Sequence, residues 1–119
     1  REIVFPESPA ELWEALTEPE RLEEWFATEV ELDPRPGGTG VFRWGNGEER
    51  RATVREAAEG ERLVLDWEEG GGEVVLELEE VDGGTLLRVV ESTPEFATAL
   101  ARRASVGRAL RADAWALVA

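Results

Sequence analysis

The 119-residue sequence contains no histidine, cysteine, lysine, methionine or tyrosine, and these absences exclude several classes of chemistry. Without cysteine there is no disulfide and no thiol nucleophile, and without histidine there is neither a Ser-His-Asp triad nor an ordinary zinc site. Without lysine there is no Schiff base. We therefore expect no metal, no cofactor and no catalytic residue, since acid–base chemistry would depend on carboxylates and ordered water alone.

Charge is strongly unbalanced, with 27 acidic residues, 13 basic residues and a formal net charge of -14. Such a surface repels polyanions, so we expect neither nucleic acid nor an anionic membrane as a partner. No apolar run approaches the roughly 20 residues that span a bilayer, and no signal-peptide pattern is visible, which favours a cytoplasmic protein. Most glutamates alternate outward on the predicted elements, so surface solvation explains them better than a paired-carboxylate active site.

The N-terminal residues predict a short strand followed by a helix. Residues 2–5 are apolar enough for a strand, and Pro6 ends it. Ser8 is a plausible N-cap with proline at the next position, and Glu11 completes a capping box three residues on. The pattern predicts a first helix over residues 9–16.

A proline then divides this helix from a second one. Pro19 pushes Glu18 out of the α region and suits the first turn of a new helix. Leu22, Trp25 and Phe26 recur at helical spacing, which places bulky apolar side chains on one face of the second helix. That face must lie against another part of the protein.

The middle of the chain predicts an antiparallel meander. Glycine-rich turns and an Asn-Gly hairpin signal separate runs that alternate between apolar and polar residues. The predicted strands cover residues 28–33, 41–44, 51–56, 62–67, 73–79 and 85–91. One face of these strands is predicted to carry Ala52, Val54, Leu63, Leu65, Trp67, Val74, Leu76, Leu78, Leu87 and Val89. Arg55, Asp66, Glu77, Glu79 and Arg88 mostly take the opposite face.

The C-terminal residues predict the element that covers the apolar face. Thr93 can cap a helix beginning at Pro94, and apolar residues then recur at helical spacing over about 25 residues. A helix of this length against a curved antiparallel sheet of about six or seven strands gives an α+β fold. No linker or repeat divides the chain, so we expect one domain over residues 1–119.

Four motifs, in order, resemble one known family. They are WEALTEPERLEEWF at residues 13–26, DPRPGG at 33–38, ERLVLDW at 61–67 and DGGT at 82–85. Together they resemble the heat-shock protein 90 ATPase activator homologues of the SRPBCC (START-like or Bet v-like) superfamily. The resemblance implies a helix-grip fold, in which a seven-stranded antiparallel sheet wraps around a long C-terminal helix.

The resemblance also implies a cavity between sheet and helices that binds a small, largely apolar molecule such as a lipid, steroid or polyketide. Two alternatives stay open. One is an enzyme of the cyclase or aromatase kind found elsewhere in the superfamily, and the other is a protein-interaction module that needs no ligand. Contact with a chaperone belongs to the second alternative, because stimulation of the chaperone by the eukaryotic co-chaperone also depends on a separate N-terminal domain.

Candidate cavity residues follow from the predicted faces. Aromatic side chains supply contact area with little loss of rotamer freedom, and an inward Glu91 facing Arg103 would form a polar pair in an apolar chamber. Glycine inside the predicted C-terminal helix could make room for a ligand. The candidates are Trp25, Phe26, Phe42, Trp44, Trp67, Leu76, Glu91, Arg103 and Gly107.

Each candidate also has a plain structural interpretation. The tryptophans could be core residues, Glu91 could reach solvent at a strand end, and Arg103 could lie along the helix flank. Gly107 could relieve a contact between helix and sheet. The glycines at 37, 38 and 40 fit a hairpin turn better than a phosphate-binding loop.

Overall fold

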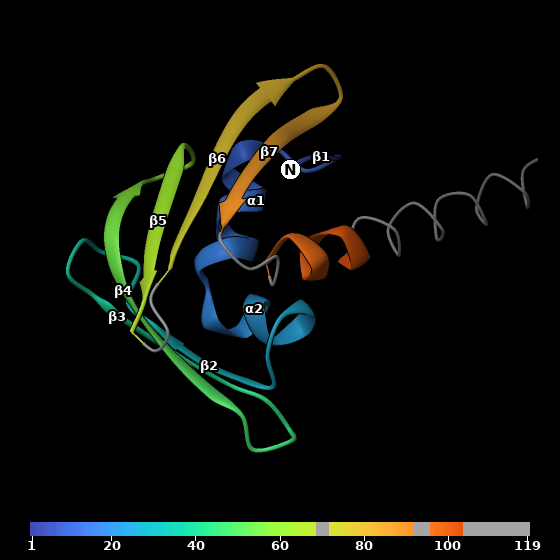
Figure 1. Cartoon of the computed structure of the whole chain (residues 1–119). Helices are drawn as coiled ribbons and strands as arrows, with labels where there is room; N and C mark the ends of the chain where they lie inside the picture. The colour runs from blue at the N-terminus through green and yellow to red at the C-terminus, as the bar shows by residue number, and fades with distance from the viewer. Residues whose placement is uncertain (69–71, 92–95, 104–119) are drawn as a thin grey trace, which may run out of the picture.

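The chain folds into one curved antiparallel sheet with helices against its concave face, as a computed structural model shows (Figure 1). The structure describes residues 1–68, 72–91 and 96–103. Its elements are β1 (Glu2–Phe5), α1 (Pro9–Thr17), α2 (Pro19–Trp25), β2 (Glu29–Leu32), β3 (Thr39–Arg43), β4 (Glu49–Ala58), β5 (Arg62–Trp67), β6 (Glu73–Val81) and β7 (Gly84–Glu91). Residues 96–103 form a further helical segment, which we call the C-terminal segment.

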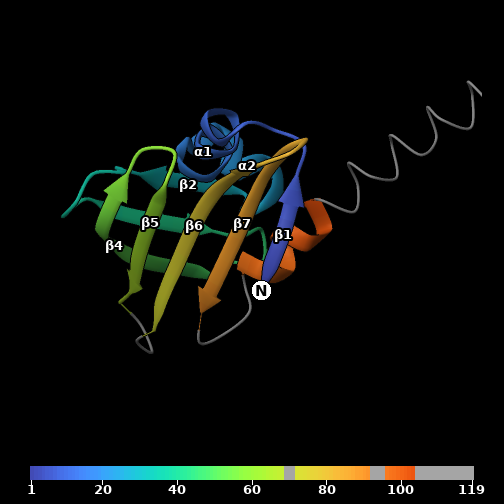
Figure 2. The same cartoon turned by 90° about the horizontal axis from the view of Figure 1, so that it is seen from above.

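The sheet is antiparallel throughout, with seven strands in the order β1-β7-β6-β5-β4-β3-β2. Strands β2 to β7 therefore form the predicted meander, and each pairs with its neighbour in the chain. Strand β1 instead lies beside β7, which brings the first and last strands together (Figure 2). The register of β4 against β5 shifts between Val54 and Glu56, and such a bulge bends the strand.

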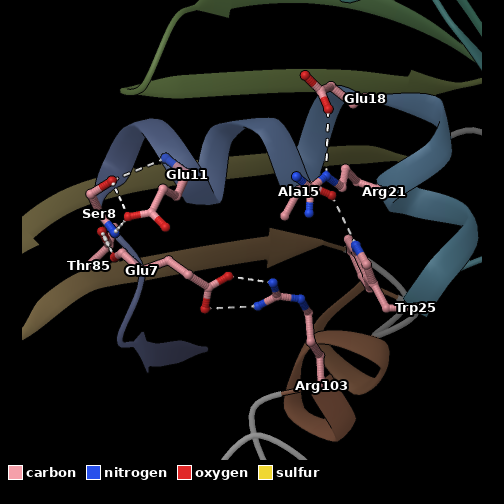
Figure 3. A network of polar contacts seen from close by, with 9 residues as sticks. All are labelled: Glu7, Ser8, Glu11, Ala15, Glu18, Arg21, Trp25, Thr85 and Arg103. Atoms are coloured by element: carbon pink, nitrogen blue, oxygen red, sulfur yellow. Dashed lines mark hydrogen bonds and ion pairs between the residues drawn. The ribbon is translucent and has the colours of Figure 1, made fainter.

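The two N-terminal helices begin and end close to where the sequence predicts. Ser8 accepts a hydrogen bond from the backbone N–H of Glu11, whose carboxylate reaches back to Ser8, so the capping box is confirmed (Figure 3). Glu18 has extended backbone angles of -79° and 125° just before Pro19, and α2 starts at that proline. Local sequence chemistry therefore sets the break between the helices.

The concave face of the sheet holds the core. The predicted inward residues of the strands are buried, apart from Leu78, which is partly buried against the core. From the helices, Leu12, Leu16 and Leu22 add fully buried side chains. Core packing on this face supplies the main stabilisation of the fold, because removing apolar surface from water is the dominant favourable term in folding.

The convex face carries the predicted outward charges, arranged as ion pairs across neighbouring strands. Arg55 pairs with Asp66 and Glu73, and Arg88 pairs with Glu2 and Glu79. These side chains are about half exposed, and exposed pairs of this kind stabilise a protein by only about 0–1 kcal/mol each. The convex face therefore contributes solubility more than stability.

The C-terminal segment lies against the concave side of the sheet (Figure 1). Its residues Phe96, Ala97 and Leu100 are buried, which confirms the start of the predicted apolar stripe. The rest of the predicted helix, including Gly107, lies outside the described residues. Within the part of the chain that the structure describes, no helix is long and apolar enough to cross a bilayer.

Replacing Gly84 by alanine tests the close approach of β1 and β7. A Cβ at this position would lie 1.8 Å from the carbonyl oxygen of Phe5, so the two strands would have to separate locally. We expect Gly84→Ala to lower the free energy of unfolding by about 2–4 kcal/mol in urea titrations. Gly83→Ala is the matched control, since Gly83 also has a positive φ (83°) but its Cβ would meet nothing within 4 Å. Equal losses in the two variants would contradict the close approach.

Candidate functional site

Five aromatic side chains meet where α2, the sheet and the C-terminal segment converge. We call this group the aromatic cluster, and its members come from four different parts of the fold. Trp25 ends α2 and Phe26 is its C-cap, while Phe42 comes from β3 and Trp67 from the end of β5. The cluster is completed by Phe96 of the C-terminal segment, whose side chain is 1% exposed.

Phe96 contacts the other four rings of the cluster. Its ring is stacked on that of Phe26, with centroids 4.2 Å apart and planes 15° from parallel, and lies 5.9 Å and 28° from that of Trp67. Phe42 and Trp25 meet it edge-on at centroid distances of 6.3 Å. Phe96 therefore occupies the space between helix and sheet where the family resemblance implies an apolar cavity.

Backbone carbonyls hold two of the tryptophans in place. The indole N–H of Trp25 donates to the carbonyl oxygen of Ala15 at 2.9 Å and so ties α2 to α1 (Figure 3). The indole N–H of Trp44 donates to the carbonyl oxygen of Phe26 at 2.8 Å, and its ring also meets that of Phe26 edge-on. In both tryptophans the indole N–H is hydrogen-bonded, and the apolar faces of the ring are left to contact neighbouring side chains.

An open groove lies beside the aromatic cluster. Its volume is about 360 Å³, and it runs between the end of α2, the β3–β4 hairpin and the C-terminal segment. Three half-buried aromatic side chains form its apolar part, and Glu48 and Arg102 add one charge of each sign. This aromatic groove is lined by Trp25, Phe26, Trp44, Glu48, Thr98, Ala99 and Arg102.

A second hollow of about 390 Å³ lies on the other side of Trp44, between β2 and the β3–β4 hairpin. Its lining is mainly charged side chains and turn backbone, with Trp44 as its aromatic residue. Three glutamates and Arg43 surround this hollow, whereas ligand pockets carry only a few placed polar groups. The aromatic groove is the better candidate for a ligand site.

Glu91 and Arg103 do not pair with each other, although the alternation along the last strand predicts an inward Glu91 that faces Arg103. The carboxylate of Glu91 accepts hydrogen bonds from the backbone N–H groups of Phe96 at 3.0 Å and Ala97 at 2.7 Å. Arg103 makes a two-pronged ion pair with Glu7 and lies over the ring of Phe5 (Figure 3). The two residues hold opposite ends of the C-terminal segment, an arrangement that strand parity alone cannot reveal.

The other predicted cavity residues lie in the aromatic cluster, in the core of the sheet or outside the described residues. The structure brings Trp25, Phe26, Phe42 and Trp67 into the cluster and places Trp44 at its edge. Leu76 is fully buried in the core of the sheet. Gly107 lies outside the described residues.

Sequence reasoning missed two residues of this region. Helical spacing places Phe96 in the predicted C-terminal helix but does not indicate that its ring is central to the cluster. Arg50 lies on β4 with its guanidinium 4.0 Å from the ring centroid of Trp67. Its parity with the buried Ala52 and Val54 was a usable signal, because alternate residues of a strand share a face.

Perturbed ionisable groups lie at the surface, away from the aromatic cluster. A hydrogen bond from Arg43 lowers the pKa of the Glu49 carboxyl, and carboxylates of Glu49 and Glu31 raise the pKa of Arg43. Arg35 likewise lowers the pKa of Asp33 through a side-chain hydrogen bond. Among the described residues no three potential metal ligands come together.

The curved seven-stranded sheet with helices against its concave face is the helix-grip architecture of the SRPBCC superfamily. Within it, the chain belongs to the family of activator of Hsp90 ATPase homolog 1-like proteins, whose sequence profile matches residues 7–115. The family resemblance seen in the sequence motifs is thereby confirmed. Among curated protein sequences none matches the chain.

Solved structures show the same fold. A protein from Rhodobacter sphaeroides is 26% identical with a TM-score of 0.69, and the match covers 92% of this chain and 91% of that one. The Aha1 dimer from Colwellia psychrerythraea is 22% identical with a TM-score of 0.70, and 92% and 90% of the two chains are covered. DynU16, a putative protein in the dynemicin biosynthetic locus, is 21% identical with a TM-score of 0.72; 93% of this chain matches 45% of that chain.

Removing the carboxylate of Glu91 tests how the C-terminal segment is held. Glu91→Ala leaves two backbone N–H groups without their charged acceptor, so we expect the free energy of unfolding to fall by about 1–3 kcal/mol in urea titrations. Glu80→Ala is the control, because Glu80 is an exposed glutamate on β6. Equal stabilities of the two variants would show that Glu91 does not anchor the segment.

Replacing Arg43 by glutamine tests the surface charge cluster. The pKa of Glu49 should rise toward its ordinary value of 4.5, because its main stabilising hydrogen bond is lost. A lowered pKa adds stability that is present above the unfolded-state pKa and lost as pH falls through the folded-state pKa. Arg43→Gln should therefore lose less stability on acidification. NMR titration of the Glu49 carboxyl measures the shift, and Arg21→Gln should leave it unchanged.

Proposed function

We propose that the protein binds a small, largely apolar molecule in the aromatic groove. The observation that carries this proposal is the gathering of half-buried Trp25, Phe26 and Trp44 around a groove of about 360 Å³. A volume of this size lies within the range of small-molecule sites. Membership of the family is compatible with such binding.

Aromatic side chains at the groove favour a ligand with a flat apolar surface. The ring of Trp44 is oriented by its hydrogen bond to Phe26, so stacking on it costs little further loss of side-chain freedom. The charges of Glu48 and Arg102 lie at the same groove and can orient a polar substituent. The ligand we expect is therefore a neutral or weakly polar molecule of modest size.

Binding is favoured over catalysis for two reasons. The chain lacks histidine, cysteine, lysine and tyrosine, which supply most general acids, bases and nucleophiles. The ionisable side chains at the groove are Glu48 and Arg102, and both are exposed to solvent.

Binding of naphthalene, a flat apolar probe, tests the groove. We expect Trp44→Ala to raise the dissociation constant for naphthalene about tenfold in equilibrium dialysis, since a stacked aromatic contact is lost. Trp44→Phe should keep most of the affinity because it keeps a ring. Val90→Ala is the matched control on the convex face, where Val90 is 61% exposed, and it should bind like the wild type.

Two outcomes would contradict the proposal. One is equal affinity of the wild type and Trp44→Ala for naphthalene, which would place the probe elsewhere. The other is a loss of naphthalene binding as the protein concentration rises, which would indicate that a second copy of the chain covers the groove. Sedimentation analysis over the same concentration range separates this second outcome from a true loss of affinity.

A further inference from the structure

The two edge strands of the sheet differ in what covers them. At one edge α2 packs against β2, and the Glu23 carboxylate accepts a hydrogen bond at 3.0 Å from the backbone N–H of Val30. Unpaired backbone groups on an edge strand are a template for another strand, and a charged cover of this kind blocks that pairing. Strand β1 forms the opposite edge, where β7 is its one neighbour in the sheet (Figure 2).

Two residues of β1 direct their backbone groups away from the sheet. Arg1 and Val89 exchange both of their backbone hydrogen bonds, at 2.7 and 2.8 Å. Hydrogen-bonded pairs alternate with non-bonded pairs along an antiparallel ladder, so the next residue, Glu2, faces away from β7, and so does Val4. No residue in the described part of the chain pairs with the N–H and C=O groups of these two residues.

Apolar side chains are also exposed at this edge. Val4 on β1 and Val90 on β7, which are 54% and 61% exposed, are the two large apolar residues that the described part of the chain leaves in solvent. Val4 shares the convex face with Glu2, because alternate residues of a strand point the same way. Arg88 pairs with Glu2 there and balances its charge. The edge of β1 therefore combines unpaired backbone groups, an apolar side chain and a neutralised carboxylate.

We propose that β1 is an interface at which two copies of the chain join through antiparallel pairing of their β1 edges. A strand pairs with its own copy about a two-fold axis, because the same groups then meet from both sides. This pairing gives partners to the outward backbone groups and brings the two Val4 side chains together on the convex face. The match of one exposed valine with another favours a second copy over an unrelated peptide.

The covered edge at β2 limits this assembly to two copies. Once the β1 edges are paired, each free end of the joined sheet is a β2 strand that α2 and Glu23 cover, so no third copy can add. Strand β1 has four residues, which makes a small interface and a reversible association. The inference goes beyond the proposed function, because no residue of β1 lines the aromatic groove.

Val4→Pro tests the pairing of the backbone. The N–H of Val4 points away from β7, so proline removes a donor to the second copy and leaves the β1–β7 ladder intact. We expect analytical ultracentrifugation of the wild type to show a reversible dimer. Val4→Pro should raise the dissociation constant of the dimer about thirtyfold, since the two-fold axis doubles the loss to two hydrogen bonds.

Val4→Arg tests the side-chain contact and serves if the proline variant does not fold. It places two like charges beside each other at the axis, so we expect no dimer at the concentrations at which the wild type dimerises. Val90→Arg is the matched control, because it makes the same change on the same face at a valine outside β1. A monomeric wild type at all concentrations, or equal dimerisation of the two arginine variants, would overturn the proposal.

Amide hydrogen exchange at Val4 identifies what covers the edge. We expect its N–H to exchange rapidly in dilute protein and to become protected as the concentration rises through the dissociation constant. A higher salt concentration should strengthen this protection, since it screens the repulsion between two chains of net charge -14. Protection that does not depend on protein concentration would show that the same chain covers β1, and this result would also overturn the proposal.

Discussion

The packing of Phe96 against four aromatic rings is the interaction on which the closed concave face depends. The partners come from α2, its C-cap, β3 and β5, so the contact is complete only when helix, sheet and C-terminal segment are all in place. Burial of aromatic side chains contributes a large share of core energetics. Phe96 thus links the C-terminal segment to α2 and to the sheet, and it fills the interior between them.

Polar contacts decide where this apolar packing is placed. Glu91 holds the start of the C-terminal segment, and the pair of Glu7 and Arg103 holds its end. Thr85, fully buried in β7, donates to the carbonyl oxygen of Glu7 at 2.7 Å and fixes the chain that leaves β1. Charge-assisted hydrogen bonds are directional. They therefore select one position of the C-terminal segment, whereas hydrophobic burial alone would permit several.

Much of the fold could be predicted from the sequence because its signals are local. The capping box at Ser8 and the proline at 19 set helix boundaries through the geometry of one or two residues. Alternation along the strands identified the buried face from Ala52 to Val89, since successive side chains point to opposite faces. Four members of the aromatic cluster were among the predicted site residues: helical spacing indicated Trp25 and Phe26, and strand alternation indicated Phe42 and Trp67.

The sequence by itself determined the elements, the buried face and the family, because helix caps, turns and strand alternation act over a few residues. Only the tertiary structure decided that Phe96 fills the predicted chamber, that Glu91 caps a segment and that Arg103 pairs with Glu7. These contacts join residues 5 to 96 positions apart in the chain. Their partners depend on how helix and sheet pack together, and no local pattern specifies that.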